Sequence, residues 1–368
     1  MEPQVELTQT LFGGVAQSRF PNLVVAMDGS FVATWGGWHD PGVGAETLWS
    51  RRSADGGRTW EPPVVIDHPA IQGGGTLVDE TTGEIFCFTQ PGHSHRQPEP
   101  PTPRRMFVSA DHGCSWRERE AQFLPDANGY IPALHMAETG ITLHRGPRPG
   151  RLIRPARVYW GDNHRGEVHY GYNTAIYSDD HGATWVPSAP FPDTGTGEGA
   201  VVELADGTLY YNSRKQYFPE EEPAHPWRHY ALSRDGGETW EGPFVCRDLP
   251  DGPRHRGPER NRDCFNGHYG ILIGLDLLRD PDGDILLASG PDDAEARRAN
   301  PTVWASRDGG KSWPFKLSLG EVLCAYSSLC VGRPGTASEG TVAVLYECGE
   351  RNSFDGALTL LSAEVFKG

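Results

Sequence analysis

The chain has 368 residues, which is enough for a large hydrophobic core without disulfides or a structural metal. Its 46 glycines, 31 prolines and 11 tryptophans are typical of short strands joined by frequent turns, and they exclude a fold built from long helices. The formal net charge of −16 at pH 7 excludes nucleic acids and anionic membrane surfaces as expected partners, so an anionic ligand would need a site with its own positive charge.

The first residues carry no export pattern. MEPQVELTQTLFGG has neither a basic nor an apolar leader region, and no stretch reaches the roughly 18 apolar residues of a spanning helix. The seven cysteines are an odd number without CxxC spacing, which argues against a disulfide framework and a structural zinc site. We therefore expect a protein of a reducing compartment, the cytoplasm.

Five copies of one phrase along the chain predict its architecture. They read SADGGRTW from Ser53, SADHGCSW from Ser109, SDDHGATW from Ser178, SRDGGETW from Ser233 and SRDGGKSW from Ser306. Each phrase predicts a tight hairpin in which Asp binds turn amides, Gly takes a positive φ and Trp packs beneath the turn. The repeated Asp residues are therefore assigned to the fold and not to catalysis.

The spacing of these phrases predicts a β-propeller. Successive aspartates lie 56, 69, 55 and 73 residues apart, which suits four-stranded antiparallel blades and gives close to six blades. We expect VELTQTLF near the start and GALTLLSAEVF near the end to complete the last blade. No stretch reads as a domain boundary, because the polar, proline-rich and basic runs fall between repeats as loops. The prediction is one all-β domain over residues 1–368.

Motifs outside the hairpins resemble those of the exo-sialidase (neuraminidase) superfamily, in the same order. They are SRFPNL from Ser18, an Asp ahead of RRSADGG, a Glu ahead of YNSRK, and AYSSL from Ala325. The resemblance extends from Arg19 to Glu347. It implies a glycoside hydrolase, an exo-α-sialidase that releases terminal sialic acid from glycoconjugates and needs no cofactor. The expected partner is a sialylated or related glycan.

In this resemblance three arginines bind the carboxylate of the substrate. They fall on Arg19 in SRFPNL, Arg214 in YNSRK and Arg298 ahead of the last hairpin phrase. A guanidinium is always charged and offers a planar fork to a carboxylate, so the three would supply the local positive charge that an acidic protein needs. Glu347 in VLYE resembles the glutamate that orients the first arginine.

The resemblance also implies the catalytic groups. Tyr326 in AYSSL would be the nucleophile with Glu198 as its partner, and Asp40 in HDPG would be the acid/base. A phenol approaches an anomeric carbon that bears a carboxylate as a neutral group, and it loses its proton to Glu198 as it attacks. Asp40 would protonate the leaving oxygen and then activate water, so the product would retain its anomeric configuration. HDPG also reads as an ordinary turn, and its position between Arg19 and the first hairpin favours the catalytic interpretation.

Two stretches depart from the family pattern. Many bacterial sialidases carry an Arg after the first-blade strand and an acidic residue in the next blade, where this chain reads TWGGWHD and IQGGGTLVD. Trp38 and His39 stand beside Asp40 as candidate pocket residues. One alternative is therefore the same machinery acting on another ulosonic acid, a deaminated sialic acid or Kdo. A second alternative is a catalytically inactive sugar-binding propeller.

Two weaker signals remain. His93 and His95 form an HxH pair, but no third ligand stands at usable spacing, so we expect no metal site. In the segment from 253 to 269, His268 and Tyr269 read either as ordinary strand residues or as pocket residues.

Overall fold

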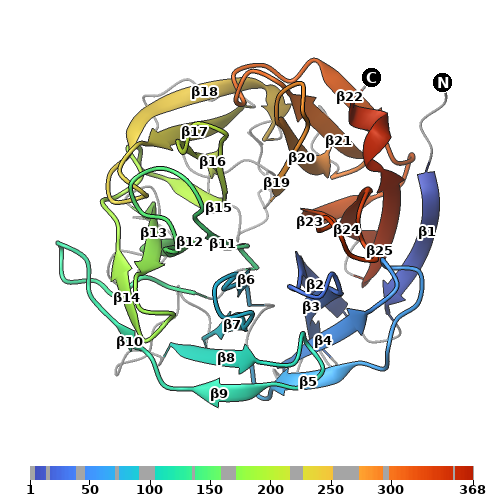
Figure 1. Ribbon diagram of the computed structural model, residues 1–368, viewed down its shortest axis with the longest axis horizontal. Helices are drawn as coiled ribbons and strands as arrows, with labels where there is room; N and C mark the ends of the chain where they lie inside the picture. The colour runs from blue at the N-terminus through green and yellow to red at the C-terminus, as the bar shows by residue number, and fades with distance from the viewer. Residues whose placement is uncertain are drawn as a thin grey trace, which may run out of the picture.

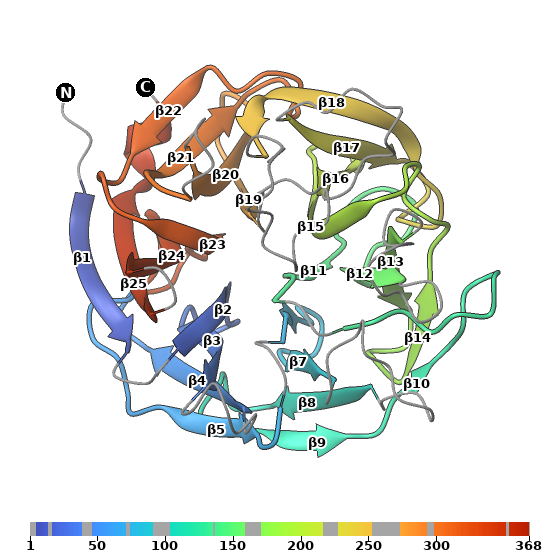
Figure 2. The ribbon, with the colours of Figure 1, turned by 180° about the vertical axis from the view of Figure 1, so that it is seen from behind.

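The computed structural model describes residues 5–13, 17–38, 46–70, 74–90, 104–134, 137–158, 171–215, 227–251, 273–292, 298–350 and 353–367. Within these ranges the strands form six sheets around a central axis, as Figure 1 shows from one side and Figure 2 from the other. The strands β2 (Gln17–Val25), β6 (Thr76–Val78), β11 (Ile141–Thr142), β15 (Thr196–Glu203), β19 (Gly274–Leu278) and β23 (Cys324–Val331) lie next to the axis, one from each sheet. This arrangement confirms the predicted six-bladed β-propeller.

The blades follow one another along the chain. The first two comprise β2 (Gln17–Val25), β3 (Phe31–Trp38), β4 (Glu46–Ser53) and β5 (Val64–Asp67), then β6 (Thr76–Val78), β7 (Ile85–Thr89), β8 (Arg105–Ser109) and β9 (Arg117–Arg119). The next two comprise β11 (Ile141–Thr142), β12 (Leu152–Val158), β13 (Tyr172–Ser178) and β14 (Thr184–Pro187), then β15 (Thr196–Glu203), β16 (Leu209–Lys215), β17 (Trp227–Ser233) and β18 (Glu241–Pro250). The fifth blade comprises β19 (Gly274–Leu278), β20 (Ile285–Pro291), β21 (Pro301–Ser306) and β22 (Phe315–Ser318).

The last blade closes the ring by joining the two ends of the chain. It comprises β23 (Cys324–Val331), β24 (Thr341–Glu350), β25 (Ser353–Ser362) and β1 (Val5–Phe12). β1 pairs antiparallel with β25 and places Val5 opposite Leu361. These are the two segments that the sequence predicted to meet. The short 3-10 helix η3 (Ala363–Phe366) follows β25.

One blade departs from the predicted four strands. β10 (Gln122–Phe123) lies on the path into the third blade and pairs parallel with β14. The outer edge of β14 leaves backbone groups to be paired, and the N–H of Gln122 donates to the carbonyl of Ala183 at 2.9 Å. The N–H of Leu124 donates likewise to the carbonyl of Trp185 at 3.0 Å. The third blade therefore has five strands because its outer edge pairs with the incoming chain.

The five repeated phrases form the hairpin turns that their composition predicts. In each, the Ser hydroxyl donates to the Asp carboxylate at 2.7–2.8 Å. The same hydroxyl accepts the backbone N–H of the Gly four residues later at 2.8–2.9 Å. The Asp carboxylate also accepts a backbone amide four residues later. The carboxylates are therefore occupied by turn bonds, which supports their assignment to the fold.

The hydrophobic core lies between neighbouring blades. Leu287 and Val303 of the fifth blade belong to one buried cluster with Val344 and Leu361 of the last blade. Similar clusters join the last blade to the first, the fourth to the fifth and the second to the third. This packing on both faces holds each innermost strand in place at the axis. In the described ranges, no helix has the length and apolar character needed to cross a membrane.

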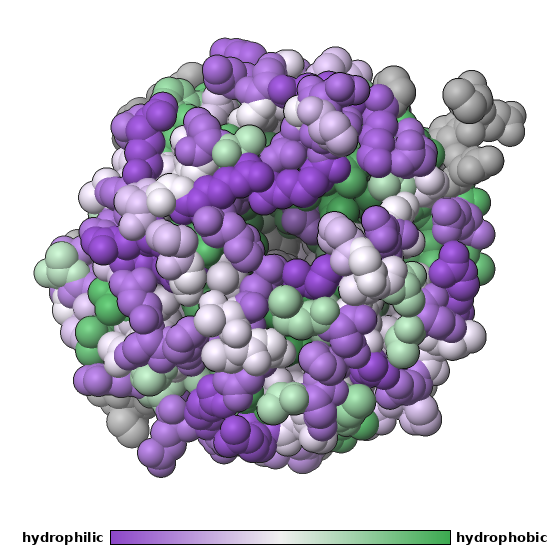
Figure 3. Space-filling view, viewed as in Figure 1, coloured by the Kyte–Doolittle hydropathy of each residue, from purple (hydrophilic) through white to green (hydrophobic). Residues whose placement is uncertain are grey.

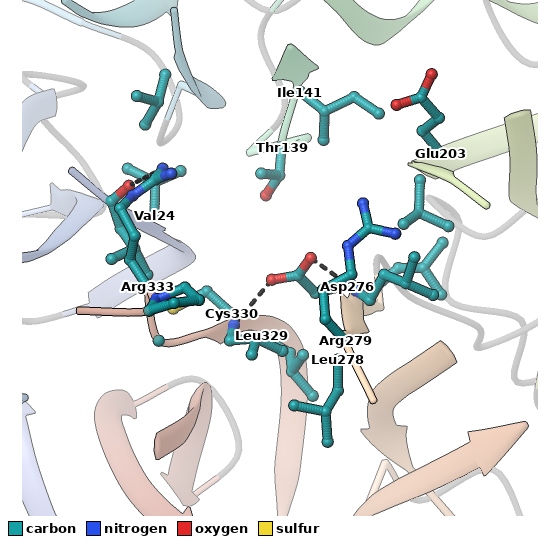
Figure 4. Close-up of a pocket in the computed structure, with 18 of the residues that line it drawn as sticks. Val24, Thr139, Ile141, Glu203, Asp276, Leu278, Arg279, Leu329, Cys330 and Arg333 are labelled. Atoms are coloured by element: carbon teal, nitrogen blue, oxygen red, sulfur yellow. Dashed lines mark hydrogen bonds between the residues drawn. The ribbon is translucent and has the colours of Figure 1, made fainter. Parts of the chain in front are cut away.

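A pocket of about 690 Å³ lies between the innermost strands at one end of the axis. The face seen in Figure 1 is hollowed at its centre, as Figure 3 shows, and Figure 4 draws the pocket with residues contributed by several blades. Its wall includes residues 23–25 of β2, 202–203 of β15 and 329–331 of β23, which are the carboxyl ends of those strands.

The charged groups of this pocket bind other parts of the protein. Arg333 donates to both carboxylate oxygens of Glu80 at 3.1 Å. Asp276 projects between the strands and accepts the backbone N–H groups of Val331 and Leu277 at 2.8 and 2.7 Å (Figure 4). Because Asp276 joins β19 to β23 and Arg333 is bound to Glu80, we interpret the charged groups of this pocket as structural.

Candidate active site

Three innermost strands carry predicted site residues on β-bulges. The pairing register shifts between Arg19 and Asn22 in β2, between Thr196 and Gly199 in β15, and between Cys324 and Ser327 in β23. A bulge places an extra residue in one strand and re-aims the side chains beside it. At Phe20 the backbone is left-handed, with φ 59°, a conformation that costs energy in a residue with a side chain. A bulge in each of three blades turns Arg19, Glu198 and Tyr326 toward one another.

A direct hydrogen bond joins Tyr326 to Glu198. The Tyr326 hydroxyl donates to Oε1 of Glu198 at 2.8 Å, and both residues are buried, with 6% and 3% exposure. Burial, together with the negative charge of Glu198, raises the pKa of Tyr326 well above its ordinary value. Burial alone would raise the pKa of Glu198, but Arg214 and Arg157 outweigh it and hold that pKa well below its usual range. The resting pair is therefore a neutral phenol and a carboxylate.

Three predicted arginines surround this pair. Arg214 in β16 donates from Nη1 to Oε2 of Glu198 at 2.7 Å. The guanidinium carbons of Arg19 and Arg298 each lie 5.5 Å from the centroid of the Tyr326 ring. Arg298 precedes β21 with a left-handed backbone, φ 53°, and its carbonyl accepts the N–H of Cys324 at 2.9 Å. The structure thus brings three guanidinium groups from three blades around one tyrosine.

Glu347 in β24 ties two of these elements together. Its Oε1 accepts Nε of Arg19 at 2.9 Å and the backbone N–H of Phe20 at 2.7 Å. Its Oε2 accepts the backbone N–H of Tyr326 at 3.2 Å. The Glu347 side chain is fully buried, so these bonds replace water around its charge. One carboxylate therefore sets the position of both the first arginine and the tyrosine backbone.

Sequence reasoning missed a second group of charged residues behind Glu198. Arg157 in β12 places Nη2 3.6 Å from Oε1 of Glu198 and 3.9 Å from Oε1 of Glu138. Arg154, on the same strand, donates to Oε2 of Glu138 at 3.2 Å. All three residues are buried. The signal was present in LIRPARV, where two arginines interrupt an otherwise apolar strand.

A further missed pair lies beside Arg214. Arg228 in β17 donates to Oδ1 of Asp251 at 3.0 Å, and Oδ2 of Asp251 accepts the backbone N–H of Lys215 at 2.7 Å. Burial raises the pKa of Asp251 to about 6, although Arg228 opposes this shift. Among the described residues, the cluster around Glu198 and Tyr326 holds more guanidinium groups than carboxylates, and all of its members except the partly exposed Arg19 and Arg298 are buried. Its members are Arg19, Arg154, Arg157, Arg214, Arg228 and Arg298 with Glu138, Glu198, Glu347 and Asp251.

Several predicted residues lie outside this geometry. His39, Asp40, His93, His95 and the segment from 253 to 269 fall outside the described residues, and Trp38 is described as the last backbone position of β3. In the described ranges, no group of three His, Cys, Asp or Glu residues is placed to hold a metal ion.

Two glycines of the stretch IQGGGTLVD, Gly74 and Gly75, lie against the backbone of neighbouring segments. A Cβ added to Gly74 would lie 1.6 Å from the carbonyl oxygen of Phe88, and one added to Gly75 would lie 1.8 Å from that of Glu138. No other residue type fits at these two positions without moving a strand. The chain therefore cannot present an acidic side chain there.

Comparisons with known proteins agree with this architecture. A family model described as BNR repeat-like domain matches residues 29–338. A sialidase from Micromonospora viridifaciens is 30% identical over 358 residues, covering 91% of this chain and 50% of that protein. A sialidase from Paraclostridium sordellii is 25% identical over 246 residues, covering 61% of this chain and 57% of that protein. The chain thus spans only about half the length of these relatives.

Solved structures share the fold at lower identity. Hadza microbial sialidase Hz136 has a TM-score of 0.70 at 22% identity, covering 96% of this chain and 67% of that chain. The intramolecular trans-sialidase from Ruminococcus gnavus has a TM-score of 0.69 at 16% identity, covering 98% of both chains. The resemblance stated from the sequence motifs is confirmed for family and fold. Since the family model covers most of the chain and its repeats form the hairpins of the blades, this protein belongs to the BNR repeat-like domain family.

Proposed function

We propose that this protein is a retaining exo-α-sialidase that releases terminal sialic acid from a glycan through a tyrosyl-linked intermediate. The observation that carries the proposal is the 2.8 Å hydrogen bond from buried Tyr326 to Glu198. A phenol bonded to a carboxylate, with guanidinium groups on its other sides, suits attack on a carbon that bears an anion. The names of the two sialidase relatives support the same activity.

The arginines would bind the carboxylate of the substrate. Arg19, Arg214 and Arg298 come from separate blades, and each guanidinium keeps its charge at any physiological pH. Guanidinium groups from three blades around one tyrosine favour an anionic ligand, because a carboxylate can accept from several planar forks at once. Three forks around one carboxylate would fix the sugar in a single orientation, with its anomeric carbon near the Tyr326 oxygen.

Binding of the substrate would prepare Glu198 to act as a base. In the free protein Arg214 holds the pKa of Glu198 low. A substrate carboxylate on Arg214 would offset part of that positive charge and so raise the affinity of Glu198 for a proton. The Tyr326 oxygen would then bond to the anomeric carbon while its proton moves to Oε1 of Glu198. A neutral phenol would thereby approach a carbon that already bears a negative group.

Asp40 would complete both steps. As the bond to the leaving oxygen breaks, Asp40 would give that oxygen its proton, which leaves the sugar bound to Tyr326. In the second step Asp40 would take a proton from water as the water oxygen attacks the anomeric carbon. The bond to Tyr326 breaks, and Glu198 returns the proton to the tyrosine. Two inversions at one carbon retain its configuration.

The alternative substrate is another ulosonic acid, a deaminated sialic acid or Kdo. The observation that favours it is the close approach of Gly74 and Gly75 to neighbouring carbonyls, since neither position can carry an acidic pocket residue. The carboxylate clamp and the tyrosine would be the same for these sugars. Only recognition of the ring substituents would differ.

The test is release of a fluorescent aryl group from its α-sialoside, beside its deaminated and Kdo analogues, with Tyr326→Phe as the control. Release of sialic acid that the variant loses supports a sialidase. Faster release from an analogue supports the alternative substrate. Binding without turnover would instead indicate a sugar-binding propeller, and turnover by Tyr326→Phe within a few-fold of the parent would overturn the tyrosine mechanism.

A further inference from the structure

We infer that Arg157, anchored by Glu138, is a positioning residue that keeps Glu198 ionised and aimed at Tyr326 while Arg214 is occupied by substrate. The inference rests on the proposed function, because it assigns a task within that reaction. It concerns a strand, β12, that contributes none of the residues implied by the family resemblance.

The geometry puts Arg157 on the side of Glu198 away from Arg214. Oε2 of Glu198 accepts Arg214 at 2.7 Å, whereas Oε1 accepts Tyr326 at 2.8 Å and lies 3.6 Å from Nη2 of Arg157. The carboxylate thus has a cation near each oxygen, and Tyr326 donates its proton toward the oxygen that Arg157 faces.

Glu138 holds the guanidinium of Arg157 in that place. Its Oε1 lies 3.9 Å from Nη2 of Arg157 and also accepts the backbone N–H of Gly199 at 3.4 Å, next to Glu198. Its Oε2 accepts Arg154 at 3.2 Å. Glu138 and Arg154 have no exposed surface, and Arg157 is 5% exposed. A buried carboxylate therefore fixes both the cation and the bulge that carries Glu198.

The charged and titratable groups facing Glu198 divide into two kinds. Some would contact substrate, and the others remain bound within the protein. The groups are Tyr326 from β23, Arg214 from β16, Arg19 from β2, Arg228 and Asp251 around β17, and Arg157 with Glu138 around β12. Among the residues that the structure describes, Arg157 is the cation within 4 Å of Glu198 that the proposed carboxylate clamp does not use.

This difference matters once substrate binds. A carboxylate on Arg214 would reduce the positive charge near Oε2 of Glu198. Without a second cation a buried carboxylate takes up a proton, and a protonated Glu198 cannot accept the proton of Tyr326. Arg157 would prevent this because it is not part of the proposed carboxylate clamp and its charge faces Glu198 and Glu138. Its charge therefore sets the lowest pH at which the enzyme–substrate complex reacts.

The test compares pH profiles of turnover on an aryl α-sialoside for the parent, Arg157→Gln, Arg157→Lys and Glu138→Gln. The acid limb of kcat reports the enzyme–substrate complex, and that of kcat/KM reports the free enzyme. We expect Arg157→Gln to move the acid limb of kcat upward by about one pH unit or more, because an opposite charge at this range shifts a pKa by about 1–3 units. The limb of kcat/KM should move less, because Arg214 still faces Glu198 in the free enzyme. Arg157→Lys should restore the parent profile.

Glu138→Gln removes the carboxylate that anchors Arg157. The acid limb of kcat should therefore move upward as in Arg157→Gln but by less, and a limb left in place or moved downward would overturn the inference. This variant also keeps the inference testable if Arg157→Gln does not fold. The matched control is Arg151→Gln, which removes a buried arginine directly before β12, where it binds Asp179 at 2.7 Å. It should lower the melting temperature without moving either limb.

The outcomes separate this inference from the proposed function. If the parent shows no turnover that depends on Tyr326, the proposed function fails and the inference fails with it. If the parent is active and Arg157→Gln keeps the parent's pH profile, only the inference is wrong. A raised KM with unchanged limbs in Arg157→Gln would also overturn it, because Arg157 would then bind substrate.

Discussion

Substituting both Tyr326 and Glu198 should lower kcat/KM little more than substituting one of them. Their side chains share a 2.8 Å hydrogen bond in a buried site, so Tyr326→Phe leaves Glu198 with no proton to accept, and Glu198→Gln leaves the phenol without its base. General base catalysis contributes about 10²–10⁴-fold, which is about 3–5 kcal/mol in the barrier to kcat/KM. Because neither residue can act alone, the coupling free energy from a double-mutant cycle should equal the smaller single loss, about 3–5 kcal/mol.

The assay is kcat/KM for an aryl α-sialoside, measured for the parent, both single variants and the double variant. Glu203 supplies the matched control because it also lies in β15, is 4% exposed, and accepts the N–H groups of His144 and Arg145 at 2.8 and 2.9 Å. Glu203→Gln with Tyr326→Phe should show coupling below about 0.5 kcal/mol. In the control, the fold losses of kcat/KM in the two single variants should multiply in the double variant. If the losses for Tyr326 and Glu198 also multiply, the idea that the pair acts as a unit is refuted.

Three further predictions concern the fold. Trp185→Ala should lower the free energy of unfolding in urea by about 3–5 kcal/mol, and Trp60→Ala should lower it by less than half of that. Both indoles donate to a Gly carbonyl, but of the two only Trp185 is fully buried. Equal losses of stability would show that the hydrogen bond dominates. Burial raises the pKa of Asp276 to about 6, above its unfolded value, so this group's contribution to stability is present below pH 4 and lost as the pH rises to 6. Between pH 4 and pH 7 the free energy of unfolding in urea should therefore fall by up to about 3 kcal/mol because of Asp276, and this fall should be absent in Asp276→Asn. A fall of the same size in the variant would show that Asp276 is not its cause. Gly75→Ala should give no soluble folded protein, since its Cβ would overlap the Glu138 carbonyl, and a native circular dichroism spectrum would disprove the close approach.

Much of the fold could be predicted because the hairpin phrase repeats and its chemistry is local. Asp180 binds amides within its own turn, so its role can be read from neighbouring residues. The closing contact of β1 with β25 could also be predicted, since an open blade must be completed from the other end of the chain. The strand β10 could not, because two residues carry no periodic signal and its pairing depends on an edge of β14 that exists only in the folded blade.

The candidate site divides in the same way. Arg19, Glu198 and Tyr326 were found through family motifs, whereas composition alone would have assigned them to strands. The bulges that aim them arise from pairing between strands and leave no sequence signature of their own. Arg157 was missed because LIRPARV shows two arginines in a strand but not which face they occupy. Its contact with Glu138 and Glu198 joins three separate elements.

Ring closure has a consequence for the order in which the protein becomes active during synthesis. Glu347 binds Arg19 across 328 positions of sequence, and Tyr326 binds Glu198 across 128. The early blades leave the ribosome first, but their arginine has no carboxylate to orient it until the last blade has been made. Contacts this distant form slowly. The appearance of the proposed activity in a refolding or translation experiment should therefore coincide with the joining of the first and last blades, and a partially completed propeller should lack it.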